Sequence, residues 1–245
     1  MERISGGKVS WRPEIAGECA VLRPRGVLDT DTYRRFGADL VRFAMDEPRA
    51  LIVALDELAL ADDGALTAFS AARIRVGDWP GVPILLAAAD EPLRRRVAAV
   101  VRRVPVLESV PAALAQAPVP PYRQRARLDM AAAAASARAA REFVARMCVR
   151  WRIAELFNDA QLLVTELVEN AMRHAIGDVR VRLDLRARGV TVAVADADPQ
   201  PAVLREPAAG EVQAYGLHVV ADLAAAWGCA PCWPTGKVVW ATLPV

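Results

Sequence analysis

Polar residues that could do chemistry are concentrated in one helical stretch, residues 163–175. Glu166 and Asn170 are four positions apart, so on an α-helix their side chains lie one turn above each other, and Arg173 and His174 follow on the same face. A carboxylate can accept a proton and an amide oxygen can ligate a hard cation, so the pair suits a bound metal–nucleotide. An amphipathic surface helix is the simpler interpretation. The apolar side chains expected to face inward are those of Leu163, Leu167, Val168 and Ala171.

The segments after this helix come in an order that favours a binding site over a plain surface helix. Two strand-like runs, 179–185 and 189–195, lead to Asp196, which begins a proline-containing turn. A glycine turn at Gly216 then begins another helix, expected over 217–226. The chain continues with Trp227-Gly228, Gly236-Lys237 and a strand at 238–243.

Residues 125–245 resemble the ATP-binding domain of the GHKL superfamily, specifically the bacterial anti-sigma-factor serine kinases. The strings that carry this resemblance occur in order: E-L-V-x-N-A-x-R-H-A, the D-x-x-P turn, the helix start G-L-x-x-V and the ending W-G…G-K-x-V-W-A-x-L. The resemblance implies a Bergerat-type α/β sandwich with ATP and Mg²⁺ as cofactors.

The resemblance also implies a role for each polar residue of the site. Asn170 would ligate Mg²⁺, and Glu166 would take the proton from the substrate hydroxyl. Asp196 would accept a hydrogen bond from the adenine amino group, although it could instead cap the following turn. Arg173 and His174 would support the phosphates or the helix end.

The resemblance places the phosphates at Gly216 and Leu217, where a helix N-terminus offers backbone N–H groups. Residues 205–213 would form a short nucleotide lid. The family commonly has G-x-G-L at this junction, whereas this chain has Ala214-Tyr215-Gly216-Leu217. One glycine is therefore lost, and Tyr215 could crowd the phosphates.

A proline-rich break indicates two domains. Pro118, Pro120 and Pro121 fall almost together, and proline both fixes φ and lacks a backbone donor. We expect a domain at 1–117, a stiff linker at 118–124 and an ATPase-like domain at 125–245. At 245 residues the chain is long enough for two ordinary cores.

The first half alternates strand-like and helical patterns, which predicts helices packed on a mostly parallel or mixed sheet and an α/β (α+β) fold class overall. Asp129 and the alanine tract 131–135 are expected to begin a long helix. The elements expected in the first half are strands at 19–22, 26–28, 51–55 and 83–88, helices at 30–45, around Leu66 and Phe69 and from Glu91, and a loop at 56–64.

Residues 8–115 resemble a STAS domain, the fold of anti-sigma-factor antagonists, through G-V-L-D at 26–29, the strand 51–56 and A-D-D-G-A-L at 61–66. In that family the loop usually reads D-S-S-G-L or D-S-T-G-L, and one hydroxyl accepts phosphate. Here Asp62, Asp63 and Gly64 offer no hydroxyl. Asp63 could imitate part of a phosphoserine's charge, or the aspartates could simply cap the helix.

Two functions follow from the combined resemblances. The first is an ATP-dependent serine/threonine kinase that phosphorylates an antagonist protein in a partner-switching circuit and restrains a sigma factor. The second is a non-catalytic, nucleotide-dependent binding module regulated by its own STAS domain. Both allow a contact between the two halves and a homodimer.

Composition disfavours other classes of protein. A net charge of +2 argues against non-specific nucleic-acid binding, and the arginines at 94–96 and 102–103 are expected on a solvated helix face.

No run approaches the roughly 18 apolar residues of a membrane span, and no signal peptide is recognised, so a cytoplasmic protein is expected. Cys229 and Cys232 lack the strand-then-helix context of a redox C-x-x-C.

Overall fold

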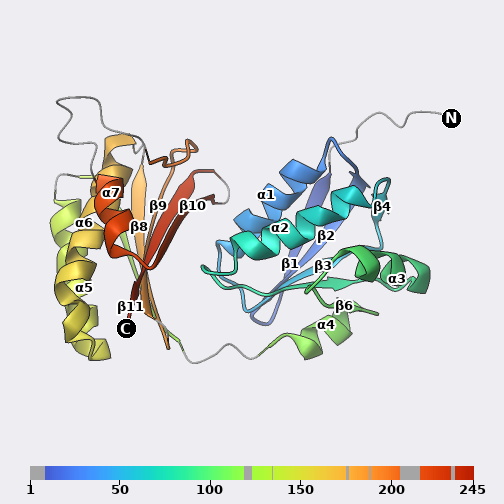
Figure 1. Cartoon of the computed structure of the whole chain (residues 1–245), viewed down its shortest axis with the longest axis horizontal. Coiled ribbons are helices and arrows are strands. Elements are labelled where there is room, and N and C mark those ends of the chain that lie inside the picture. The colour runs from blue at the N-terminus through green and yellow to red at the C-terminus, as the bar shows by residue number, and fades with distance from the viewer. Residues whose placement is uncertain are drawn as a thin grey trace. The chain divides into compact units, whose positions relative to one another are not determined.

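The computed structural model describes residues 9–118, 123–133, 135–174, 177–187, 189–204, 216–232 and 235–245. The chain divides into two compact units, Met1–Pro120 and Pro121–Val245 (Figure 1). Each unit is described by itself. Of the expected linker, residues 119–122 lie outside the described residues.

The N-terminal unit is built on a six-stranded mixed sheet. Its strands are β1 (Ser10–Ala16), β2 (Cys19–Leu28), β3 (Leu51–Ala54), β4 (Leu58–Leu60), β5 (Ile84–Ala87) and β6 (Val106–Leu107). The order is β1-β2-β3-β5-β6, with β4 also beside β2. Strand β1 is antiparallel to β2, and the remaining pairs are parallel. The expected mixed sheet is therefore confirmed.

Helices cover both faces of this sheet. They are α1 (Tyr33–Ala44), the 3-10 turn η1 (Gly64–Leu66), α2 (Thr67–Arg75), α3 (Glu91–Val100) and α4 (Val110–Gln116). Helices α1 and α2 pack together on one face, and Phe36 meets Phe69 edge-on there. Helix α4 covers the other face, where Ala113 packs with Ile52 and Leu85.

Two expectations for the N-terminal unit were wrong. Residues 19–28 form one strand instead of two, because β1 pairs with β2 along its length from Cys19 to Arg25 and β4 pairs with its end. The segment 56–64, expected as a loop, contains β4, which pairs with β2 in parallel. Both differences arise from pairing with strands that the local pattern does not reveal.

The C-terminal unit is a two-layer α/β sandwich. Its strands are β7 (Gln124–Ala131), β8 (Asp178–Arg186), β9 (Gly189–Asp196), β10 (Ala226–Pro231) and β11 (Lys237–Pro244). They form an antiparallel sheet in the order β10-β11-β9-β8-β7. Its helices are α5 (Ser136–Trp151), the 3-10 turn η2 (Ala154–Leu156), α6 (Phe157–His174) and α7 (Gly216–Leu223). Helices α5, α6 and α7 lie on one face of the sheet (Figure 1). The expected fold class is confirmed.

The alternation of side chains along the strands decides which residues face the helices. Val192 and Val194 on β9 belong to the core beneath α5 and α6, as do Val239 and Ala241 on β11. Side chains two positions apart share a face of a strand. Asp196 and Lys237 therefore point to the helix side, at the end of the sheet where β9 ends and β11 begins.

The expectation that a helix begins near Asp129 was also wrong, because Asp129 lies in β7 and α5 begins at Ser136. In β7, Leu128 and Met130 pack against the core, and Asp129 binds Arg127 and Arg180 on the opposite face. The adjacent alanine tract hid this period-2 pattern. The helix expected over 217–226 ends at Leu223, and β10 follows as the edge strand beside β11.

Candidate functional site

Helix α6 presents the polar face expected from the sequence. Leu163, Leu167, Val168 and Ala171 are buried, as expected, and α6 packs against α5, α7, β9 and β11. Glu166 and Asn170 are half-buried, whereas Glu169 and Arg173 are exposed. Glu166 and Asn170 therefore border the protein interior. The side chain of His174 lies outside the described residues.

Helix α7 begins directly against Glu166. A Cβ built on Gly216 would lie 2.5 Å from Glu166 Oε2 and 3.7 Å from Arg173 Nη2. Leu217 is half-buried and packs on the core of the unit. The fold thus brings Gly216, Glu166 and Arg173 to one place. A side chain larger than hydrogen at position 216 would enter the space that the carboxylate occupies.

The surroundings of Glu166 raise the pKa of its carboxyl group. Burial raises the pKa of its carboxyl above the ordinary value, and the negative charge of Glu169 raises it further, while Arg173 opposes the rise. A carboxylate with a raised pKa is a better base near neutral pH than an exposed glutamate.

A second polar group lies where β9 ends. Asp196 and Lys237 are 4% and 3% exposed, and Lys237 Nζ donates to Asp196 Oδ1 at 2.9 Å. The same ammonium binds Asp198 Oδ2 at 2.9 Å and the Asp198 carbonyl at 3.3 Å. The backbone N–H of Asp198 also donates to Asp196 Oδ1, at 2.9 Å. Asp196 therefore does cap the turn that follows it.

The other carboxylate oxygen of Asp196 is free to accept a hydrogen bond. Oδ2 is buried and has no hydrogen-bond partner among the residues that the structure describes. Buried polar oxygens are normally satisfied, so a solitary acceptor on the helix side of the sheet is suited to a ligand donor such as an exocyclic amino group.

Asn170 is available as an oxygen ligand, because its side chain makes no hydrogen bond within the described part of the chain. The same part contains no group of three or more histidine, cysteine, aspartate or glutamate side chains that could hold a metal ion. A cation at Asn170 would therefore take most of its ligands from a bound phosphate or from water.

In the N-terminal unit, the two aspartates of the 62–64 loop have different contacts. Asp62 Oδ1 accepts from the backbone N–H of Gly64 at 2.8 Å, which is a capping contact. Asp63 makes no such cap and instead accepts from Arg96 Nε at 2.6 Å. Arg96 also donates to the carbonyl of Leu60 at 3.2 Å. Asp63 is thus ion-paired with an arginine of α3.

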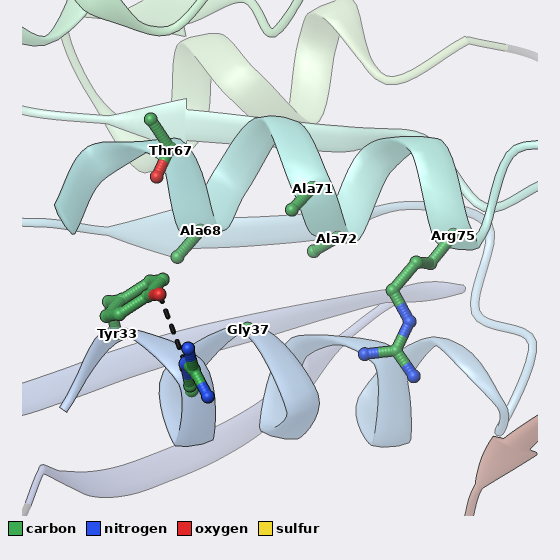
Figure 2. A pocket seen from close by; sticks show the side chains of 8 residues that line it. Tyr33, Gly37, Thr67, Ala68, Ala71, Ala72 and Arg75 are labelled. Carbon is green, nitrogen blue, oxygen red and sulfur yellow. Dashed lines mark hydrogen bonds between the residues drawn. The ribbon is translucent and has the colours of Figure 1, made fainter. Parts of the chain in front are cut away.

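A hollow of about 280 Å³ lies along the line where α1 packs against α2 in the same unit. Small residues, among them Gly37 and Ala68, form its middle (Figure 2). Tyr33, whose hydroxyl accepts from Arg34 Nε at 3.1 Å, stands at one end and Arg75 at the other. None of the residues that line it is a carboxylate, histidine or cysteine. It contains none of the residues expected in a site.

Other expectations concern the surface and the cysteines. Arg95 and Arg96 are exposed on α3, as expected, while Arg94 is half-buried and donates to the carbonyls of Ala88 and Ala89. Arg102 and Arg103 are also exposed, but they follow the end of α3 at Val100, so the expectation that they lie on a helix face was wrong. None of the four cysteines forms a disulfide bond. In the described part of the chain, no helix combines the length and the apolar character that crossing a bilayer requires.

Reasoning from the sequence missed Lys237 as a site residue. It was recognised only as part of the closing G-K string. A lysine in a run that otherwise reads as a buried strand was the available signal, because a buried ammonium needs a carboxylate partner. Residues 205–213, expected as the lid, and Ala214-Tyr215 lie outside the described residues.

The C-terminal unit is thus a two-layer domain with one antiparallel sheet, one helical layer and a buried acidic group. Residues 130–243 match the family described as "Histidine kinase-like ATPase domain". The C-terminal unit is therefore a domain of this family, as its sequence resemblance indicated, and such a domain implies a site for ATP.

Two solved structures are similar to part of the chain. One is an anti-sigma factor antagonist from Mycobacterium paratuberculosis, with 18% sequence identity and a TM-score of 0.39, covering 45% of this chain and 94% of that one. The other is the anti-sigma factor antagonist SpoIIAA in its unphosphorylated form, with 18% identity and a TM-score of 0.32, covering 43% and 94% of the two chains. No curated protein matches the chain significantly.

Proposed function

We propose that this protein is an ATP-dependent serine/threonine kinase of a bacterial partner-switching pathway, which transfers the γ-phosphate of ATP to a STAS antagonist. The observation that carries the proposal is the Glu166 carboxylate, half-buried and with a raised pKa, directly against the N-terminus of α7. It lies in a domain of an ATPase family. A base beside an anion-binding helix end suits phosphoryl transfer.

In the proposed reaction Glu166 accepts the proton of the substrate hydroxyl as that oxygen bonds to the γ-phosphorus. The bond from the γ-phosphorus to the bridging oxygen breaks, and ADP leaves with the electron pair. Raising the pKa of Glu166 increases its affinity for the proton that it must take. Asn170 would hold Mg²⁺, which supplies neutralisation of phosphate charge when it is bound.

The remaining residues of the site would hold the nucleotide. Asp196 would accept from the adenine amino group through Oδ2, the oxygen without a protein donor among the described residues. Gly216 and Leu217 would offer backbone N–H groups to phosphate, since the first N–H groups of a helix lack intrahelical acceptors. Arg173 and His174 would add positive charge or hydrogen bonds there.

A second function, a nucleotide-dependent binding module without catalysis, is favoured by one feature of the sequence. The family commonly has a glycine at the position of Ala214, and a glycine there lets the backbone approach the phosphates closely. In this alternative, nucleotide state would set the choice of partner and no phosphate would be transferred.

The experiment that separates these functions measures transfer from radiolabelled ATP to a STAS protein. The kinase predicts magnesium-dependent transfer that Glu166→Ala abolishes while nucleotide binding survives. Asn170→Ala should weaken nucleotide binding in the presence of magnesium. Glu142→Ala is the matched control, because Glu142 is exposed on α5 and, among the described residues, pairs only with Arg138. Binding without transfer by the wild type would favour the second function, and absence of nucleotide binding would refute both.

The N-terminal unit would act as a built-in pseudosubstrate. Its loop offers Asp62, Asp63 and Gly64 in place of a phosphate acceptor, and the carboxylate of Asp63 binds Arg96 there. A short connector would keep the unit at an effective concentration on the order of millimolar. Deleting residues 1–115 should then increase kinase activity or partner binding, and no change would contradict this role. A sigma factor as partner, a homodimer and a cytoplasmic location belong to the same proposal.

A further inference from the structure

The buried cluster of Asp196, Asp198 and Lys237 has a feature that nucleotide binding alone does not require. Lys237 Nζ donates hydrogen bonds to Asp196 Oδ1, to the carboxylate of Asp198 and to the backbone carbonyl of Asp198. All three of its N–H groups can thus be satisfied inside the protein. Lys237 therefore has no donor left over for a ligand and acts through the aspartates.

The contacts of Lys237 decide which oxygen of Asp196 remains available. Oδ1 accepts from both Lys237 Nζ and the backbone N–H of Asp198. Oδ2 is buried without a donor among the described residues. Because two donors hold Oδ1, the carboxyl plane is fixed, and Oδ2 is the oxygen left as an acceptor.

Lys237 also bears on the charge of Asp196. Burial raises the pKa of Asp196, and the hydrogen bond and positive charge of Lys237 oppose that rise, while the charge of Asp198 adds to it. Burial alone would lower the pKa of Lys237, but its hydrogen bonds to Asp198 and Asp196 leave the pKa above its ordinary value. The positive charge of Lys237 therefore favours the ionised form of Asp196.

Other charged groups near β9 do not replace Lys237. Neighbouring strand β8 and helix α6 carry charged residues, but none makes a hydrogen bond or ion pair with Asp196 within the described part of the chain. On β11, Lys237 is the first residue and the rest of the strand is uncharged. The charged residues of α6 and β8 are Asp159, Glu166, Glu169, Arg173, Asp178, Arg180, Arg182, Asp184 and Arg186.

We propose that Lys237 is a specificity-determining residue, which makes the base pocket select a 6-amino purine over a 6-oxo purine by holding Asp196 as a carboxylate with Oδ2 turned to the base. This inference rests on the proposed binding of ATP at this site. An ionised carboxylate only accepts hydrogen bonds, so it binds the amino group of adenine and repels the carbonyl of hypoxanthine. A neutral carboxyl can donate to that carbonyl and loses the discrimination.

The test compares binding of ATP and inosine triphosphate, which differ at this position of the base. Both nucleotides compete against a fluorescent ATP analogue on the full-length protein, between about pH 6 and pH 9, a range that lies above the ordinary aspartate pKa. The wild type should prefer ATP by about tenfold or more, with little change over this range, as expected for a hydrogen bond to a charged group.

Lys237→Gln removes the charge and keeps a hydrogen-bond donor. Without the ammonium, the pKa of Asp196 rises further, so the preference for ATP should fall to within about threefold at the lowest pH and recover as the pH rises. Lys237→Met is the second variant, with the same expected pH dependence. Arg186→Met is the matched control, because it removes a cation that pairs with another buried aspartate, Asp184 on β8, beside the opposite end of β9 from Asp196. It should keep the wild-type preference.

The outcomes separate this inference from the function on which it rests. If the wild type binds ATP but the Lys237 variants weaken both nucleotides equally at every pH, the lysine is only structural and the inference is wrong. A Lys237 variant that keeps the wild-type preference also overturns it. If the wild type binds neither nucleotide, the proposed function is wrong and the inference fails with it.

Discussion

Replacing Gly216 with alanine tests whether the start of α7 and the Glu166 carboxylate form one reacting site. The new Cβ would lie 2.5 Å from Glu166 Oε2, which is about 1 Å closer than an ordinary non-bonded contact. The neighbour that must move is the end of a flexible side chain. We therefore expect the Glu166 carboxylate to shift by roughly 1 Å with little disturbance of the backbone.

The consequence for catalysis should exceed the consequence for folding. A displacement of about 1 Å of a reacting group can reduce the rate on the order of 10²-fold, so the single-turnover rate constant for transfer to the STAS protein should fall by about that factor. Alanine is favoured over glycine in a helix by up to about 1 kcal/mol, so the free energy of unfolding should change by no more than about 1 kcal/mol.

The assay is single-turnover transfer from radiolabelled ATP, with thermal unfolding measured on the same samples. Combining Gly216→Ala with Glu166→Ala provides the control, since a change that acts through Glu166 should have no further effect once that carboxylate is gone. A wild-type rate for Gly216→Ala would refute the reasoning. Equal and additive losses in the double variant would also refute it.

Two further substitutions test the same site through stability. Glu166→Gln should stabilise the protein near neutral pH by less than about 1 kcal/mol. The pKa of Glu166 is raised in the folded state, so protonated Glu166 stabilises the fold at low pH, and this stability is lost as the pH rises through the folded-state pKa. Glutamine resembles the protonated glutamate and remains neutral at every pH. The gain over wild type should shrink towards pH 4 in thermal unfolding, and a gain that is the same at every pH would contradict the pKa direction. Gly236→Ala should destabilise the C-terminal unit by about 2 kcal/mol or more, because Gly236 has φ +105° and a Cβ there would overlap the backbone oxygen of Asp196. Calorimetry should show its transition lowered by roughly 8 °C or more, and an unchanged transition would show that the turn can rearrange.

Parts of the fold that depend on local periodicity were predictable. Strands β8 and β9 and the polar face of α6 follow from side-chain spacing within single elements, and Glu166 with Asn170 was found in this way. Strand β7 was missed because a short alternating run next to an alanine tract reads as helix. Strand β4 was missed because three residues carry too little pattern, and only the partner β2 makes them a strand.

By itself, the sequence determined the order of the motifs, the composition of the site on α6, the class of the C-terminal domain and the absence of a hydroxyl in the Asp62-Asp63-Gly64 loop. Only the tertiary structure decided that Gly216 lies against Glu166, that Arg96 pairs with Asp63, and that Lys237 holds one oxygen of Asp196 and leaves the other free. The physical reason is that these contacts join residues tens of positions apart. Strand register and helix packing set them, and local spacing along the chain carries no information about either.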